Sequence, residues 1–116
     1  MIRFEIDVPP STNNLYANAR GKGRVKSLAY RQWLEAAAWE VKAQVQGRKL
    51  DAPWAITIRA HIRSTRDISN LIKPIEDLVV KLRLAPDDRF CRKVTAIRDE
   101  TMAGGRAIVT IEEVGK

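Results

Sequence analysis

The sequence WAITIRAHI, residues 54–62, alternates apolar and polar side chains and decides the fold class of this chain. One side of the alternation carries Trp54, Ile56, Ile58, Ala60 and Ile62, and the other carries Thr57, Arg59, His61 and Arg63. A period of two is typical of a β-strand with one face in a core. We therefore expect a central strand with one buried face and one basic, exposed face.

Two elements are predicted before this strand. Residues 2–8 alternate in the same way and place Ile2, Phe4, Ile6 and Val8 on the buried face, until Pro9-Pro10 ends the strand. Residues 11–26 show no apolar periodicity, which predicts a long loop. Ser27 can cap a helix that runs to about Gln46, with Leu34, Ala38, Val41 and Val45 on one stripe.

Helical spacing returns after the central strand, where Leu71, Ile75, Leu78 and Leu82 lie between Asp67 and Leu84. Pro74 lacks an N–H, so this helix should begin only a few residues before it, with Ser69 or Asn70 as the cap. Residues 94–98 and 107–114 are predicted strands joined across residues 102–105. The order β-α-β-α-β-β predicts one α+β domain over residues 1–116, with a mixed or antiparallel sheet and two main helices.

The charge balance limits the class of partner. Twenty-one Lys and Arg stand against 14 Asp and Glu, a net charge of +7, which favours a polyanionic partner. Charge alone does not separate DNA from RNA, anionic lipid or a ribosomal surface. No apolar run approaches the roughly 20 residues that span a bilayer, which argues against an integral membrane role. The single cysteine, Cys91, forms no internal disulfide and suits a reducing cytoplasm.

Asp67, Asp77, Asp87 and Asp88 are candidate metal ligands. In so basic a chain, carboxylates near a nucleic acid repel its phosphates unless a divalent cation such as Mg²⁺ reverses the sign. Lys73 and Asp77 are four residues apart and share a helix face. Taken singly, each acid is more often a helix cap, an ion-pair partner or a turn residue.

The segment RDISNLIKPIEDL, residues 66–78, followed by Asp87-Asp88, resembles the signature of the RusA family of Holliday junction resolvases. Members of that family carry an acid-x-acid-Asn-Leu-x-Lys segment, an Asp four residues after the Lys, and a downstream Asp-Asp loop. The resemblance extends to Pro9-Pro10-Ser11 with Asn13 and Asn14, to Ala29-Tyr30-Arg31, and to the Gly-Gly turn before the last strand. It covers almost the whole chain.

The resemblance implies a Mg²⁺-dependent endodeoxyribonuclease that resolves four-way DNA junctions in recombination and repair. It implies that Asp67 and Asp88 bind the metal and that Lys73 is a catalytic cation beside the scissile phosphate. Two symmetric nicks need two matched sites, so we expect a homodimer. The second acid of the signature falls on Ser69, a poor Mg²⁺ ligand, and we expect slowed cleavage with DNA binding retained. Asp77 or Asp87 could fill the missing position.

Basic and aromatic residues extend the predicted DNA footprint. Arg20, Lys22, Arg24 and Lys26 alternate with small residues in a Gly-containing loop that suits phosphate contact, although a solubilising loop is the plainer interpretation. Arg59, Arg63 and Arg66 approach the acidic turn, and Phe90 beside Asp88 is a candidate wedge at the junction. Trp33 and Trp39 could offer stacking surfaces, although aromatic residues on amphipathic elements are more often core residues. His61 could act as a general base, although we expect it to be a plain strand-face residue.

Three functions stay open on these grounds. The first is the junction-resolving nuclease, and the second is a non-catalytic branched-DNA-binding protein of the same fold that lost an acid at Ser69. The third is a basic RNA-associated or interaction module in which the acids only cap and pair. Mg²⁺-dependent cleavage of a synthetic four-way junction separates the first two, and competition between a junction and structured RNA separates both from the third.

Overall fold

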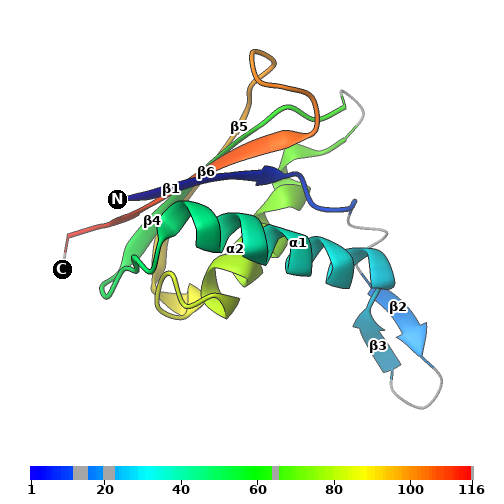
Figure 1. The fold of residues 1–116 in the computed structure, drawn as a ribbon, viewed down its shortest axis with the longest axis horizontal. Coiled ribbons are helices and arrows are strands. Elements are labelled where there is room, and N and C mark those ends of the chain that lie inside the picture. Colours follow the sequence, from blue (N-terminus) through cyan, green and yellow to red (C-terminus); the bar gives the residue numbers. More distant parts are fainter. Residues whose placement is uncertain (12–15, 20–22, 64–65, 116) are drawn as a thin grey trace.

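The computed structural model describes residues 1–11, 16–19, 23–63 and 66–115, with the side chains of residues 18, 19, 23 and 24 excepted. Its elements are β1 (Ile2–Asp7), β2 (Tyr16–Ala19), β3 (Gly23–Lys26), α1 (Leu28–Val45), β4 (Trp54–Ala60), the 3₁₀ helix η2 (Ile68–Leu71), α2 (Ile72–Lys81), the 3₁₀ helix η3 (Asp88–Phe90), β5 (Cys91–Arg98) and β6 (Arg106–Glu113). Figure 1 shows both α-helices on one side of the main sheet, with the β2–β3 hairpin beyond the start of α1.

The main sheet is mixed, and its strand order is β1-β6-β4-β5. β6 pairs antiparallel with β1 and with β4, whereas β4 and β5 run parallel. The predicted α+β class and mixed sheet are therefore confirmed. The last two strands are consecutive in the chain but do not pair, because β4 lies between them.

The register of the sheet stacks apolar side chains into rows under the helices. Ile2 and Ile56 both face Ile111, and Phe4 and Ile58 both face Val109. These side chains are at most 2% exposed, as the alternation in the sequence predicted. If a strand slipped by one residue against its neighbour, its whole row of apolar side chains would face solvent. Each of these side chains stabilises the fold by roughly 1.5–3 kcal/mol when buried, so the register is strongly determined.

Helix α1 begins and ends almost where the sequence predicted. The Ser27 hydroxyl accepts a hydrogen bond from the Tyr30 N–H at 3.1 Å, and Gln46 ends the helix with a left-handed φ of 50°. Trp33 is buried, and its Nε1 donates to the Asp7 carbonyl at 2.8 Å. Trp39 is 73% exposed, so the prediction that it belongs to the core is wrong. Among the described residues, no helix is long and apolar enough to cross a membrane.

The start of the second helix differs from the prediction. Asp67, and not Ser69 or Asn70, caps the segment by accepting from the Ser69 N–H, and a turn of 3₁₀ helix precedes α2. Pro74 then lies in the first turn of α2. Proline is tolerated there because the first N–H groups of a helix have no partner within the helix. Because of the 3₁₀ turn, helical structure begins at Ile68, several residues before Pro74.

Residues 16–19 and 23–26 of the predicted long loop form a hairpin, so the prediction of a loop is wrong for these residues. β2 and β3 pair antiparallel, with Tyr16 opposite Lys26. The Tyr16 ring meets the Tyr30 ring of α1 edge-on, with centroids 5.9 Å apart. The hairpin pairs through its backbone and contacts the Tyr30 ring through Tyr16 and Lys26. Such contacts leave no apolar period in the sequence, which explains why the hairpin was missed.

Candidate active site

The structure brings together one lysine and two aspartates of the sequence signature. Lys73 and Asp77 lie one turn apart on α2, with Lys73 Nζ 3.0 Å from Asp77 Oδ1. The same Nζ lies 3.6 Å from Oδ2 of Asp88, the first residue of η3. Side-chain exposures of 63% for Lys73 and 49% for Asp88 leave this cluster open to a large substrate.

The acidic turn is fixed to the centre of the sheet. Trp54, the fully buried first residue of β4, donates through Nε1 to the Pro86 carbonyl at 3.1 Å. Asp87 follows and caps η3 by accepting from the Arg89 N–H at 3.2 Å. Asp88 is therefore held where its carboxylate reaches Lys73, and the contact does not depend on a free loop.

Tyr30 supports the cluster from the core, a role that the sequence did not reveal. Its hydroxyl donates to Asp77 Oδ2 at 3.2 Å, across 47 residues of sequence. The Tyr30 side chain is fully buried and stacks on the Trp33 ring, with centroids 6.2 Å apart. Burial and the neighbouring Asp77 carboxylate raise the pKa of Tyr30, so the hydroxyl stays protonated as a donor. Asp77 is thus held between Tyr30 and Lys73.

The charges around Lys73 are mostly negative. The hydrogen bond with Asp77 and the charge of Asp88 raise the pKa of Lys73, so it is an ammonium at neutral pH. Burial, and then the charge of Asp88, raise the pKa of Glu76. Hydrogen bonding with the Asp88 side chain and with the Arg89 N–H lowers the pKa of Asp87. One cation among several carboxyl groups makes a site that attracts a further cation.

Asp67 has a separate set of contacts. Its Oδ1 accepts from the Ser69 N–H at 3.1 Å and from the Ser69 hydroxyl at 2.9 Å, and these bonds lower the pKa of Asp67. In the described ranges, Asp67 makes no hydrogen bond or ion pair with Lys73 or Asp88. Nor does this part of the chain group three acidic, histidine or cysteine side chains so that they could hold a metal ion. The structure therefore joins Lys73, Asp77 and Asp88 and leaves Asp67 with Ser69.

A hollow of about 410 Å³ opens beside these acids. Its lining includes the acids Asp77, Asp87 and Asp88 and the lysines Lys26 and Lys81. Lys26 comes from β3 and lies over the Tyr30 ring, 5.8 Å from its centroid. Of the predicted basic loop, Lys26 is thus placed beside the candidate site. Arg20, Lys22 and the side chain of Arg24 lie outside the described residues, as do Asn13 and Asn14.

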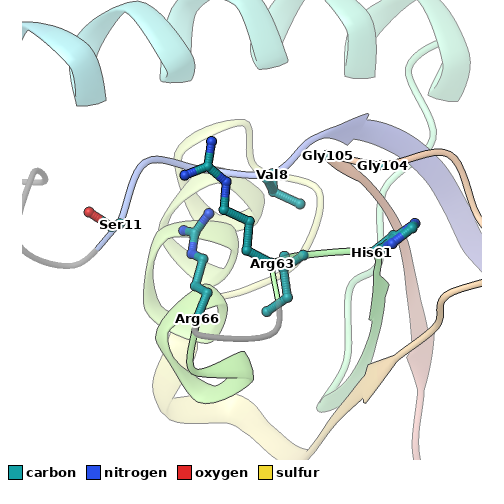
Figure 2. Close-up of a pocket in the computed structure, with 8 residues that line it drawn as sticks. Val8, Ser11, His61, Arg63, Arg66, Gly104 and Gly105 are labelled. Atoms are coloured by element: carbon teal, nitrogen blue, oxygen red, sulfur yellow. The ribbon is translucent and has the colours of Figure 1, made fainter.

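Arg63 and Arg66 line a second hollow of about 740 Å³ at the other end of the sheet. Figure 2 shows their side chains extending in the same direction, while His61 points away from them. Arg66 Nη2 donates to the carbonyls of Pro9 and Pro10 at 2.6 and 2.9 Å, and its buried Nε has no partner among the described residues. Burial lowers the pKa of Arg66. No acid is among the described residues that line this hollow, which suits an anion.

Two further predicted footprint residues lie at opposite ends of β5. Phe90 precedes β5 and is 36% exposed. The Arg89 guanidinium lies over its ring, 5.1 Å from the ring centroid. Arg59 pairs with Asp99 just after β5, with 3.5 Å between Nε and Oδ2. Phe90 is therefore close to Asp88 as expected, whereas Arg59 already has an acidic partner.

Comparison with known proteins gives one consistent match. The family model described as endodeoxyribonuclease RusA matches residues 7–112. The chain is 32% identical to the crossover junction endodeoxyribonuclease RusA of Escherichia coli strain K12 over 111 residues, which covers 92% of this chain and 90% of that protein. It is 31% identical, with the same coverage, to the crossover junction endodeoxyribonuclease of Enterobacteria phage 82.

Proposed function

This chain belongs to the RusA family of endodeoxyribonucleases, and from that premise we propose that it is a nuclease that resolves four-way DNA junctions. The observation that carries the proposal is the contact of Lys73 with both Asp77 and Asp88. A positive charge between carboxylates, on the surface of a chain of net charge +7, suits a site that receives a phosphodiester. The single Cys91 is consistent with a cytoplasmic place of action.

The donor chemistry of the site fits Mg²⁺. This cation takes oxygen ligands and is commonly held by one or two carboxylates, with water and substrate phosphate completing its shell. Asp88, together with Asp77 or Asp87, would supply those carboxylates here. Mg²⁺ bound there would polarise the phosphodiester and favour hydroxide formation from water. Asp67, the other predicted ligand, would contribute only if it left its bonds to Ser69.

The chain's own groups then have distinct tasks. Lys73 holds a positive charge where Asp77 and Asp88 meet, and in that position it would stabilise the charge that develops on the cleaved phosphate. Asp77 orients the ammonium, and the Tyr30 hydroxyl orients Asp77. Arg63, Arg66 and the basic segment that ends at Lys26 would bind the DNA backbone at either side of the site. We propose a homodimer, because two symmetric nicks need two such sites.

Ser69 supports a second candidate function. The hydroxyl that replaces a family carboxylate is already committed to Asp67. A chain with this arrangement would bind branched DNA without cutting it efficiently, because a missing carboxylate weakens metal binding more than it weakens phosphate binding. The non-catalytic junction-binding protein is therefore the alternative.

Junction cleavage across a Mg²⁺ titration distinguishes these functions. We expect the unmodified chain to bind a synthetic four-way junction and to cut it slowly. Ser69→Asp should raise the cleavage rate, and Asp88→Asn in that background should remove it while leaving binding in place. Robust cutting by the unmodified chain at low Mg²⁺ would contradict impaired catalysis, and absence of cutting by Ser69→Asp would favour the non-catalytic alternative.

A further inference from the structure

Three adjoining hollows follow α1 away from the acidic turn. The hollow beside Asp88 shares Lys26, Leu34 and Lys81 with a second hollow of about 690 Å³. The second shares Lys42 and Leu82 with a third of about 200 Å³. We call these three adjoining hollows the α1 groove. It begins at the candidate active site and ends beyond the last turn of α1.

The dimensions of the α1 groove suit a length of nucleic acid. Its long wall is one stripe of α1 that runs from Arg31 through Leu34, Ala38 and Lys42 to Val45, and the end of α2 forms the other wall. From Arg31 to Val45 the helix rises about 21 Å at about 1.5 Å per residue. That length corresponds to roughly six base-pair steps of about 3.4 Å each in duplex DNA.

The groove is lined by cations once it leaves the acidic turn. Its middle part presents Lys26, Arg31, Lys42 and Lys81 against one acid, Glu35. Its far end presents Lys42, Arg48, Lys49 and Arg83, and no acid is among its described lining residues. Such a run of positive charge is complementary to a phosphate backbone and gives no comparable attraction for an apolar peptide.

Trp39 adds an apolar contact in the middle of the groove. Its side chain is 73% exposed, and Lys42 Nζ lies 5.9 Å from its ring centroid. The other two tryptophans of the chain, Trp33 and Trp54, are buried. An exposed indole beside cations suits a partner that presents phosphates and an apolar sugar surface together.

We propose that the α1 groove binds the backbone of one duplex arm of the DNA substrate, the arm whose scissile phosphate lies at Asp88. The lysines and arginines of the groove contact successive phosphates, and Trp39 packs against a deoxyribose of the same strand. This inference rests on the proposed nuclease function. It adds where the DNA arm runs once it leaves the candidate active site. The far end of the groove then contacts DNA about six base pairs from the branch point.

The first test measures junction binding in EDTA, where no metal-dependent cleavage occurs. Lys49→Gln combined with Arg83→Gln removes two positive charges at the far end, and Arg3→Glu makes the same change in net charge on β1, away from the groove. The salt slope is the steepness with which the logarithm of the binding constant falls with the logarithm of the salt concentration. Losing two phosphate contacts should lower this slope by about 1.8. Between about 50 and 200 mM salt, wild-type affinity should then fall about 12-fold more than that of the double variant.

Arm length provides the internal control. Junctions with hairpin-closed arms of about 4 base pairs do not reach the far end, whereas arms of about 15 base pairs do. The double variant should therefore match wild type on short arms and lose affinity only on long arms, and Arg3→Glu should match wild type on both. An equal loss on short and long arms, or the same loss with Arg3→Glu, would overturn the proposal.

Tryptophan emission tests the groove directly. Because Trp39 is the exposed tryptophan, junction binding should change the emission of the wild-type protein but not that of Trp39→Phe. Binding without any emission change would overturn the proposal. An emission change that follows protein concentration in the absence of DNA would also overturn it, since a second copy of the chain would then occupy the groove. A wild-type protein that does not bind junctions at all contradicts the proposed function itself.

Discussion

Replacing Tyr30 with Phe removes one hydroxyl and leaves the ring that stacks on Trp33. A hydrogen bond to a charged acceptor contributes about 1.5–3 kcal/mol. The O···O distance of 3.2 Å is long for such a bond, and the Asp77 side chain is 28% exposed, so water replaces part of what is lost. We therefore expect the free energy of unfolding to fall by about 1 kcal/mol, which lowers the Tm by roughly 4 °C.

Urea unfolding measures this loss, and a double-mutant cycle assigns it. If the hydroxyl acts through the Asp77 carboxylate, Tyr30→Phe should cost almost nothing in an Asp77→Ala background. In the Ser69→Asp protein, Tyr30→Phe should slow junction cleavage about threefold to tenfold and leave junction affinity unchanged, because Lys73 loses part of its orientation. An equal stability loss in both backgrounds, or an unchanged cleavage rate, would refute the positioning role of Tyr30.

Thr101→Val removes a hydroxyl that donates to Asp99 and, with the Thr101 N–H, lowers the pKa of Asp99 below its ordinary 3.8. That stabilisation is present above pH 3.8 and is lost as the pH falls through the folded-state pKa, so urea unfolding across pH should show a smaller acid-induced loss in the variant. Neutralising Lys22, Arg24 and Lys26 together should lower the salt slope of junction binding by up to about 2.7, and an unchanged slope would exclude these residues from the footprint. Light scattering at micromolar concentration should report a homodimer, and a strict monomer with and without junction DNA would count against the resolvase proposal.

The site was predictable where its signal was local. Lys73 and Asp77 are four residues apart on a helix, so their contact follows from helical geometry. The approach of Asp88 to Lys73 depends on how the turn after α2 is anchored through Trp54 to the sheet. Asp67 and Ser69 were assigned from the family signature as a metal ligand and a missing ligand. In the structure, the Ser69 hydroxyl donates a hydrogen bond to the Asp67 carboxylate, and the metal-ligand role of Asp67 stays a prediction.

The sequence by itself determined the elements whose signals repeat along the chain. Alternation in residues 2–8 and 54–62 specified two strands and the buried row of each, and Ser27 specified the start of α1, because strand period and helix capping are set by neighbouring residues. The second face of β4 is less exposed than the alternation predicted, since Ala55 is buried and Thr57 is half-buried. The net charge of +7, from 21 basic and 14 acidic residues, likewise indicated a polyanionic partner. This charge was available from the sequence because it depends on composition and not on the fold.

Only the tertiary structure decided the contacts between distant segments. The insertion of β4 between β5 and β6, the hydrogen bond from Tyr30 to Asp77, and the exposure of Trp39 in a basic groove each depend on how α1 and α2 pack against the sheet. Packing brings together residues that are dozens of positions apart in the sequence. The hydrophobic periodicity of a single helix or strand does not indicate which of these residues will be in contact. For that reason the sequence indicated the chemistry of the site, and the fold decided which side chains share it.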